Sequence, residues 1–87
     1  MELNKEIVIS KMNETDGGML FDLKTGSYYR INDVACFIVE CIKSGNANNI
    51  ETIASLLCEE YEVDTATASE DVASVVEDLI QLGIIIE

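Results

Sequence analysis

The sequence predicts an α+β fold, with a three-stranded antiparallel sheet followed by three helices in a winged helix-turn-helix arrangement. Two observations lead to this fold class. Short strand-like segments separated by turn formers occupy the chain up to Ile31, and from Val34 onward the apolar residues repeat with the period of a helix. The length of 87 residues also fits one small domain, which we expect to span residues 1–87.

Three short strands account for the first third of the chain. A β-branched run favours a strand over Glu6–Met12. Dense turn formers at Asn13–Gly18 separate it from an alternating strand over Met19–Leu23. The hairpin turn Lys24–Gly26 then leads into a third strand at Ser27–Ile31, so the sequence order predicts a meander.

Two amphipathic helices are expected next. Asn32 or Asp33 can cap the first, whose apolar stripe starts at Val34, and Gly45 can end it. The segment Asn48–Glu51 resembles a capping box with Asn in place of Ser or Thr, and predicts the start of the second helix.

A third helix is predicted from a cap at Asp64 or Thr65 to Leu82, with Gly83 as its stop. The apolar tail Ile84–Ile86 is then a last strand or a packed end. Apolar residues cover about half of the helix circumference at about 100° per residue. This half could either serve the core alone or lend part of its surface to a partner. Its members are Val72, Ala73, Val75, Val76, Leu79, Ile80 and Leu82.

The charge excludes several classes of partner. Seventeen Asp and Glu oppose five Lys and Arg, and the last basic residue is Lys43. Nucleic-acid binding depends on Lys and Arg contacts to phosphates, so we expect no nucleic-acid partner, and an anionic membrane is disfavoured for the same reason. A basic peptide or protein face would be attracted, although the acids could also serve solubility alone.

The residues needed for common chemistry are missing. The chain has no His, no glycine-rich phosphate loop and no calcium-loop pattern, so we expect neither catalysis nor a metal or cofactor. Cys36, Cys41 and Cys58 lack zinc-site spacing and are expected to be free thiols in a reducing cytoplasm. The start of the chain has no apolar run suited to export or membrane spanning.

One edge of the predicted meander is a candidate binding surface. In sequence order, either Ser27–Ile31 or the first strand lies at an edge, which offers unpaired backbone groups to a peptide strand. Tyr28 and Tyr29 would project to opposite faces, one toward a groove and the other inward.

Three segments together resemble PqqD-like proteins. They are D-L-K-T-G-S-Y-Y-R-I-N at Asp22–Asn32, I-E-T-I-A-S-L-L-C-E-E-Y-E-V-D at Ile50–Asp64, and E-D-V-A-S-V-V-E-D-L-I-Q-L-G-I-I at Glu70–Ile85. The resemblance spans about Ile7 to Ile86. The sequence departs from the family pattern at Val75, where the family often has Phe.

The resemblance implies a RiPP recognition element, which binds the leader of a ribosomally made precursor peptide. In such domains the leader adds as a strand beside the third strand and against the third helix. The chain looks most similar to free-standing members from lasso peptide pathways, which act with a leader peptidase and a cyclase. Carried onto this chain, the peptide-binding residues are Ser27, Tyr28, Tyr29, Arg30, Ile31, Asp71, Val72, Val75, Asp78 and Leu79.

Two other classes of protein share some of these features. A winged-helix transcriptional regulator would need a basic recognition helix, and the third helix carries acids without Lys or Arg. An acidic carrier protein would need a prosthetic-group Ser after an Asp, and neither Ser69 nor Ser74 follows one. A more general acidic protein-interaction adaptor remains an alternative to leader binding.

Overall fold

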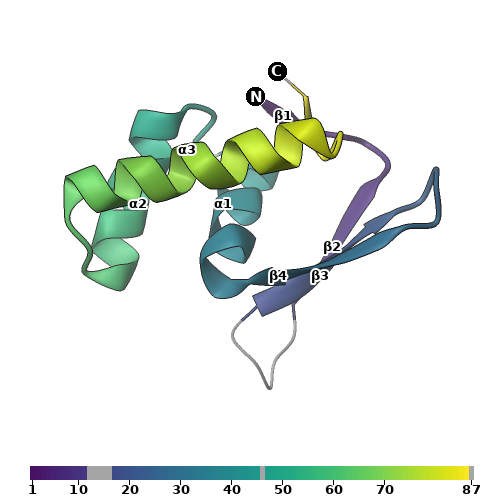
Figure 1. The fold of residues 1–87 in the computed structure, drawn as a ribbon, viewed down its shortest axis with the longest axis horizontal. Coiled ribbons are helices and arrows are strands. Elements are labelled where there is room, and N and C mark those ends of the chain that lie inside the picture. Colours follow the sequence, from purple (N-terminus) through teal and green to yellow (C-terminus); the bar gives the residue numbers. More distant parts are fainter. Residues whose placement is uncertain (12–16, 46, 87) are drawn as a thin grey trace.

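Three antiparallel strands form a sheet in the order β2-β3-β4 on one side of the molecule (Figure 1). They span Ile7–Lys11 (β2), Gly17–Asp22 (β3) and Tyr28–Asn32 (β4). The computed structural model describes residues 1–11, 17–45 and 47–86. The predicted meander is confirmed, with Leu20 opposite both Ile9 and Tyr29.

The turn predicted over Asn13–Gly18 extends two residues too far at its C-terminal end, because β3 already begins at Gly17. Residues 13–16 lie outside the described part of the chain, but Gly17 and Gly18 belong to β3 and pair with β4. A Cβ on Gly17 would lie 2.5 Å from the carbonyl oxygen of Ile31. This close backbone approach explains why glycine occurs inside a strand here.

Three helices follow, as predicted, and span Asp33–Ser44 (α1), Ile50–Tyr61 (α2) and Thr65–Gln81 (α3). The side-chain oxygens of Asn32 and Asp64 cap α1 and α3, two of the predicted alternatives. The predicted capping box at Asn48 was wrong by one residue. Asn49 is the cap of α2, because its side chain accepts a hydrogen bond of 2.8 Å from the N–H of Thr52.

The two ends of the described chain lie side by side (Figure 1). A short strand β1, Glu2–Leu3, pairs antiparallel with β5, Ile85–Ile86. The side chain of Asn4 also donates a hydrogen bond of 2.9 Å to the carbonyl of Gly83. The sequence predicted the C-terminal apolar tail as a strand or packed end, but gave no sign of β1, since two residues carry no periodicity.

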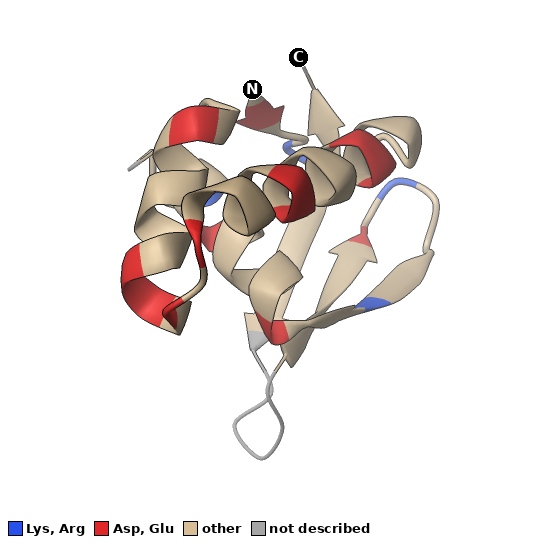
Figure 2. Ribbon diagram, turned by 60° about the vertical axis from the view of Figure 1, so that its left-hand side comes forward, with Lys and Arg blue, Asp and Glu red and all other residues tan. Residues whose placement is uncertain are grey.

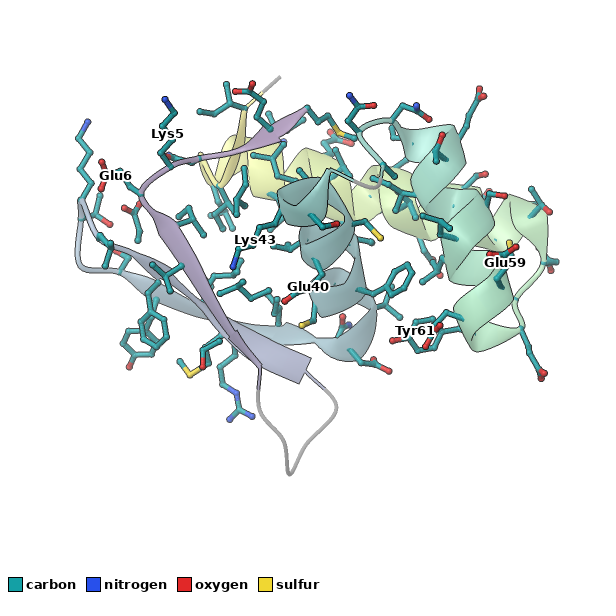
Figure 3. All side chains as sticks on the ribbon, turned by 180° about the vertical axis from the view of Figure 1, so that it is seen from behind. Lys5, Glu6, Glu40, Lys43, Glu59 and Tyr61 are labelled. Carbon is teal, nitrogen blue, oxygen red and sulfur yellow. The ribbon has the colours of Figure 1, made fainter. Side chains whose placement is uncertain are left out.

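All three helices lie on one side of the sheet (Figures 1 and 3), but α1 is the helix that packs directly on it, and the core lies between the sheet and α1 and among the helices. α1 packs on β3 and β4, and α3 packs mainly on α2 and crosses α1. Tyr61 of α2 meets Phe37 of α1 with ring centroids 5.8 Å apart in an edge-to-face pair (Figure 3). The largest fully buried side chains are Leu20, Ile38, Ile53, Leu57, Ile84 and Ile85.

Within the described part of the chain, no helix lies over the opposite face of the sheet (Figure 3). The strand register places Val8, Phe21 and Tyr28 in one cross-strand row on this face. All three side chains are exposed, and the rings of Phe21 and Tyr28 lie 6.5 Å apart. The molecule therefore presents an apolar sheet face to its surroundings.

Candidate functional site

β4 is an edge strand of the described sheet, so one side of its backbone is free for pairing. The N–H of Asp22 donates a hydrogen bond of 2.8 Å to the carbonyl of Ser27 across the hairpin. Backbone groups in an antiparallel pair point alternately toward and away from the neighbouring strand. The N–H and C=O groups of Tyr29 and Ile31 therefore point toward β3, whereas those of Tyr28 and Arg30 point outward.

A groove of about 230 Å³ lies beside this edge, between β4 and α3. α1 closes its end, because Ala35 in the first turn of α1 contributes to the lining together with the helix cap Asn32. Apolar walls beside an unpaired strand edge are the arrangement that captures an extended peptide, whose backbone pairs while its side chains enter pockets. The lining residues are Arg30, Ile31, Asn32, Ala35, Val75, Asp78 and Leu79.

Five of the ten residues expected to bind a peptide line this groove together. They are Arg30, Ile31, Val75, Asp78 and Leu79. The sequence analysis missed Asn32 and Ala35, because both were assigned only to starting the first helix. Their position directly after the edge strand was the one available signal, since the first turn of a helix that follows β4 must lie at the end of any groove along it.

Val72, which was expected to contact the peptide, does not belong to the lining of this groove. Its side chain is 0% exposed and packs in the core, so it supports α3 from inside. At about 100° per residue, Val72 points about 60° away from Val75 around the helix, which is enough to turn it from the groove to the core.

The remaining expected residues surround the groove without lining it. Tyr29 is half-buried and packs against the core, whereas Tyr28 is 65% exposed on the outer sheet face. Ser27 precedes β4 and is exposed. Asp71 is exposed one turn before Val75 on α3. Of the two strand residues predicted for the groove wall, Arg30 belongs to the lining and Tyr28 does not, and Ile31 is the strand residue whose side chain lies on the helix side of the sheet.

The charges are divided between the two halves of the molecule (Figure 2). α2 and α3 carry seven acids and no Lys or Arg. The sheet half carries Arg30 on β4 and Lys24 in the β3–β4 hairpin (Figure 2). The groove lies on the boundary: Asp78 lines it from α3, and Arg30 borders it at the strand edge, with its side chain on the outer face of the sheet.

No clustered ligands for a metal occur among the described residues. Of the three cysteines, Cys36 and Cys41 are buried and Cys58 is half-buried. Burial raises the pKa of the Cys41 thiol, and the neighbouring Glu40 carboxylate raises it further. A thiol with a raised pKa is a poor nucleophile near neutral pH.

Within the described residues, none of the helices combines the length and apolar character needed to cross a membrane.

Two solved structures share this fold over nearly the whole chain. One, "TbiB1 in Complex with the TbiA(beta) Leader Peptide", has 25% sequence identity and a TM-score of 0.83, and the match covers 97% of this chain and 93% of that chain. The other, "Lasso peptide synthetase B1 complexed with the leader peptide", has 30% identity and a TM-score of 0.81, covering 99% and 96%. Comparison with curated protein sequences gave no significant match.

The sequence also matches a protein family directly. The family is described as "Coenzyme PQQ synthesis protein D (PqqD)", and the match runs over residues 17–85, from β3 to β5. It includes β4, α1 and α3, which together form the groove. The resemblance seen in the three sequence segments is thereby confirmed, and the chain belongs to the PqqD family.

Proposed function

We propose that this protein is a RiPP recognition element that binds the leader segment of a ribosomally synthesised precursor peptide in lasso peptide biosynthesis. The observation that carries the proposal is the free edge of β4 beside the groove with α3. The leader pairs with the outward backbone groups of Tyr28 and Arg30, and its side chains enter the groove over Ile31, Val75 and Leu79. Both similar solved structures are described as complexes with a leader peptide, which supports this assignment.

The protein acts by presenting the leader and performs no chemical step. The chain has no His to serve as a general base, and burial raises the pKa of the Cys41 thiol, which disfavours its nucleophilic thiolate form. The cytoplasm, where precursor peptides are synthesised, is the compartment in which such a protein would work. A leader peptidase and a cyclase are the enzymes to which it would present the bound precursor.

The uncovered sheet face is the surface that we assign to the leader peptidase. Val8, Phe21 and Tyr28 expose a continuous apolar row there, on the side of the sheet away from the groove-lining Ile31. A leader strand added to β4 extends the same sheet by one strand. The peptidase would then contact the sheet face and the added strand together.

Binding and processing can be tested separately. Fluorescence anisotropy with the labelled leader segment of a candidate lasso precursor should show saturable binding to the isolated protein. Mass spectrometry of the precursor incubated with this protein alone should show an unchanged mass. Absence of binding would overturn leader recognition, whereas a processed product would overturn the non-catalytic role.

A further inference from the structure

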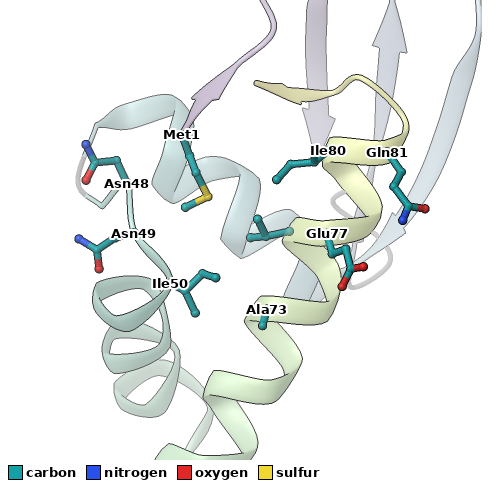
Figure 4. A pocket seen from close by; sticks show the side chains of 9 residues that line it. Met1, Asn48, Asn49, Ile50, Ala73, Glu77, Ile80 and Gln81 are labelled. Atoms are coloured by element: carbon teal, nitrogen blue, oxygen red, sulfur yellow. The ribbon is translucent and has the colours of Figure 1, made fainter. Parts of the chain in front are cut away.

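A second and larger pocket lies on the other flank of α3, between that helix and the start of α2 (Figure 4). Its volume is about 680 Å³. Val75 in the leader groove and Ile80 in this pocket are five residues apart, so at about 100° per residue they point about 140° apart around α3. The pocket is therefore distinct from the groove beside β4.

The inner part of this pocket is apolar. Ile50 and Ile80 point into it from α2 and α3, and Met1 lies above them (Figure 4). Val76 is buried, whereas Ile50, Ala73 and Ile80 are only half-buried. These half-exposed aliphatic side chains face one another across the pocket. Binding is favoured when another apolar group displaces the water between them, because apolar surface is then removed from water.

The rim of the pocket is polar and includes one carboxylate, that of Glu77. Glu77 and Gln81 border it from α3, and Asn48 and Asn49 border it from the loop before α2 (Figure 4). Glu51 follows the pocket residue Ile50 in the first turn of α2. Neither helix supplies a Lys or Arg to balance these carboxylates. A ligand that carries positive charge beside its apolar group would therefore be attracted to this pocket electrostatically.

We propose that this pocket is a second interaction site, which takes a large apolar side chain carried by a basic segment of a partner protein. The charge complementarity argues for a basic partner and against a second copy of this chain, which has a net charge of −12. The site uses the flank of α3 that the leader groove leaves unoccupied. A partner can thus bind while the leader lies along β4.

Two synthetic amphipathic peptides of equal length serve as probes, one built from Leu and Lys and the other from Leu and Glu. NMR titration of the isotope-labelled protein should show amide shifts at Ile50, Ala73, Glu77 and Ile80 with the Leu/Lys peptide and no binding of the Leu/Glu peptide. Shifts spread evenly over the acidic surface, or binding of both peptides, would overturn the proposal.

Three variants sharpen the test. Ala73→Arg places a long cationic side chain in the pocket and should weaken Leu/Lys binding by about tenfold or more, as expected for loss of an anchor contact. Glu77→Lys on the rim should weaken it more than Glu70→Lys, a matched charge reversal on α3 outside the lining. If Glu70→Lys and Glu77→Lys lowered the affinity for the Leu/Lys peptide equally, the effect would be a general electrostatic attraction. The proposed site would then be wrong.

The leader groove provides an independent reference. Ala73→Arg and Glu77→Lys should leave leader affinity unchanged, and Val75→Glu should leave the shifts at Ile50 and Ile80 unchanged. If the leader displaced the Leu/Lys peptide from a single shared site, the second-site proposal would be wrong. The proposal that the protein binds a leader would be unaffected. Circular dichroism verifies the fold of each variant, and the Glu70 and Glu77 pair decides the question even if Ala73→Arg is destabilised.

Discussion

Ile31 in β4 and Val75 in α3 line one groove, next to an edge whose backbone groups at Tyr28 and Arg30 point outward. The sheet edge can fix the register of a bound strand, and the two aliphatic side chains can select what the strand carries. Because Val75 is half-buried, its side chain is open to a ligand while its backbone is held in the middle of α3. This pairing of an edge and a helix leads to the first two predictions.

Val75→Glu should weaken leader binding without unfolding the protein. The substitution puts a charge against the apolar wall of the groove, where a bound peptide would exclude water from it. We expect affinity to fall by at least about tenfold, or roughly 1.4 kcal/mol, measured by anisotropy. Ser74→Glu, on the exposed neighbouring position, is the matched control and should bind normally. Tight binding by Val75→Glu with a native circular dichroism spectrum would place the leader elsewhere.

Hydrogen exchange should show which backbone amides of the β4 edge form hydrogen bonds with the leader. Leader binding should slow exchange at the amides of Tyr28 and Arg30, because these groups point outward and gain partners. The amides of Tyr29 and Ile31, already paired with β3, should change little. The prediction is checked by measuring amide exchange rates residue by residue, with and without the leader. New protection confined to α2 would mean that the leader does not add to this strand.

Tyr28→Ala and Tyr29→Ala should have opposite effects. Tyr29 packs against the core, so its truncation should cost about 1–3 kcal/mol, below the range for a fully buried aromatic, and should lower the melting temperature. Tyr28 is exposed, so Tyr28→Ala should change stability by less than about 0.5 kcal/mol. It should instead weaken stimulation of the leader peptidase, measured as the cleavage rate at saturating leader. An unchanged rate would remove the outer sheet face from the interface.

Salt should weaken leader binding only modestly. Asp71 and Asp78 are exposed, and exposed ion pairs are each worth about 0–1 kcal/mol and are screened by salt. Affinity measured at low and high ionic strength should therefore fall without being lost, for a leader that carries Lys or Arg. The Asp71→Asn, Asp78→Asn double variant should show a flatter dependence. A wild-type affinity independent of salt would assign the acids to solubility alone.

The cap of α3 predicts a pH-dependent contribution to stability. Backbone and side-chain hydrogen bonds from Thr67 lower the pKa of the Asp64 carboxyl from its ordinary 3.8. A lowered pKa means that the charged form stabilises the folded state at pH values above 3.8, and that this contribution is lost as the pH falls through the lowered pKa. Thermal melts of Asp64→Ala should thus differ from wild type at neutral pH and converge with it in acid.

A separate variant distinguishes the charge of Asp64 from its capping bond. Asp64→Asn keeps an acceptor oxygen for the N–H of Thr67 and should retain most of the cap at all pH values. A constant gap between wild type and Asp64→Ala down to low pH would show that the carboxylate charge contributes nothing.

The sequence by itself determined the elements that depend on local periodicity and caps. Alternation placed the strand of Leu20, and helical spacing placed the stripes of α1 to α3. The sequence narrowed two helix starts to Asn32 or Asp33 and to Asp64 or Thr65, and the structure selected Asn32 and Asp64. The local sequence could not identify a helix start where two adjacent residues were equally suited to cap the helix. Asn48 and Asn49 are both good caps, and only the packed position of α2 decides that Asn49 accepts the bond.

The tertiary structure alone decided which side chains share a surface. Val72 and Val75 look alike in sequence, but a turn of about 60° around α3 puts Val72 in the core and Val75 in the groove. The pairing of β1 with β5 and the addition of Ala35 to the groove join residues that no local pattern connects. These contacts depend on the packing of distant elements, and the free energy of that packing is not encoded in any short window of the chain.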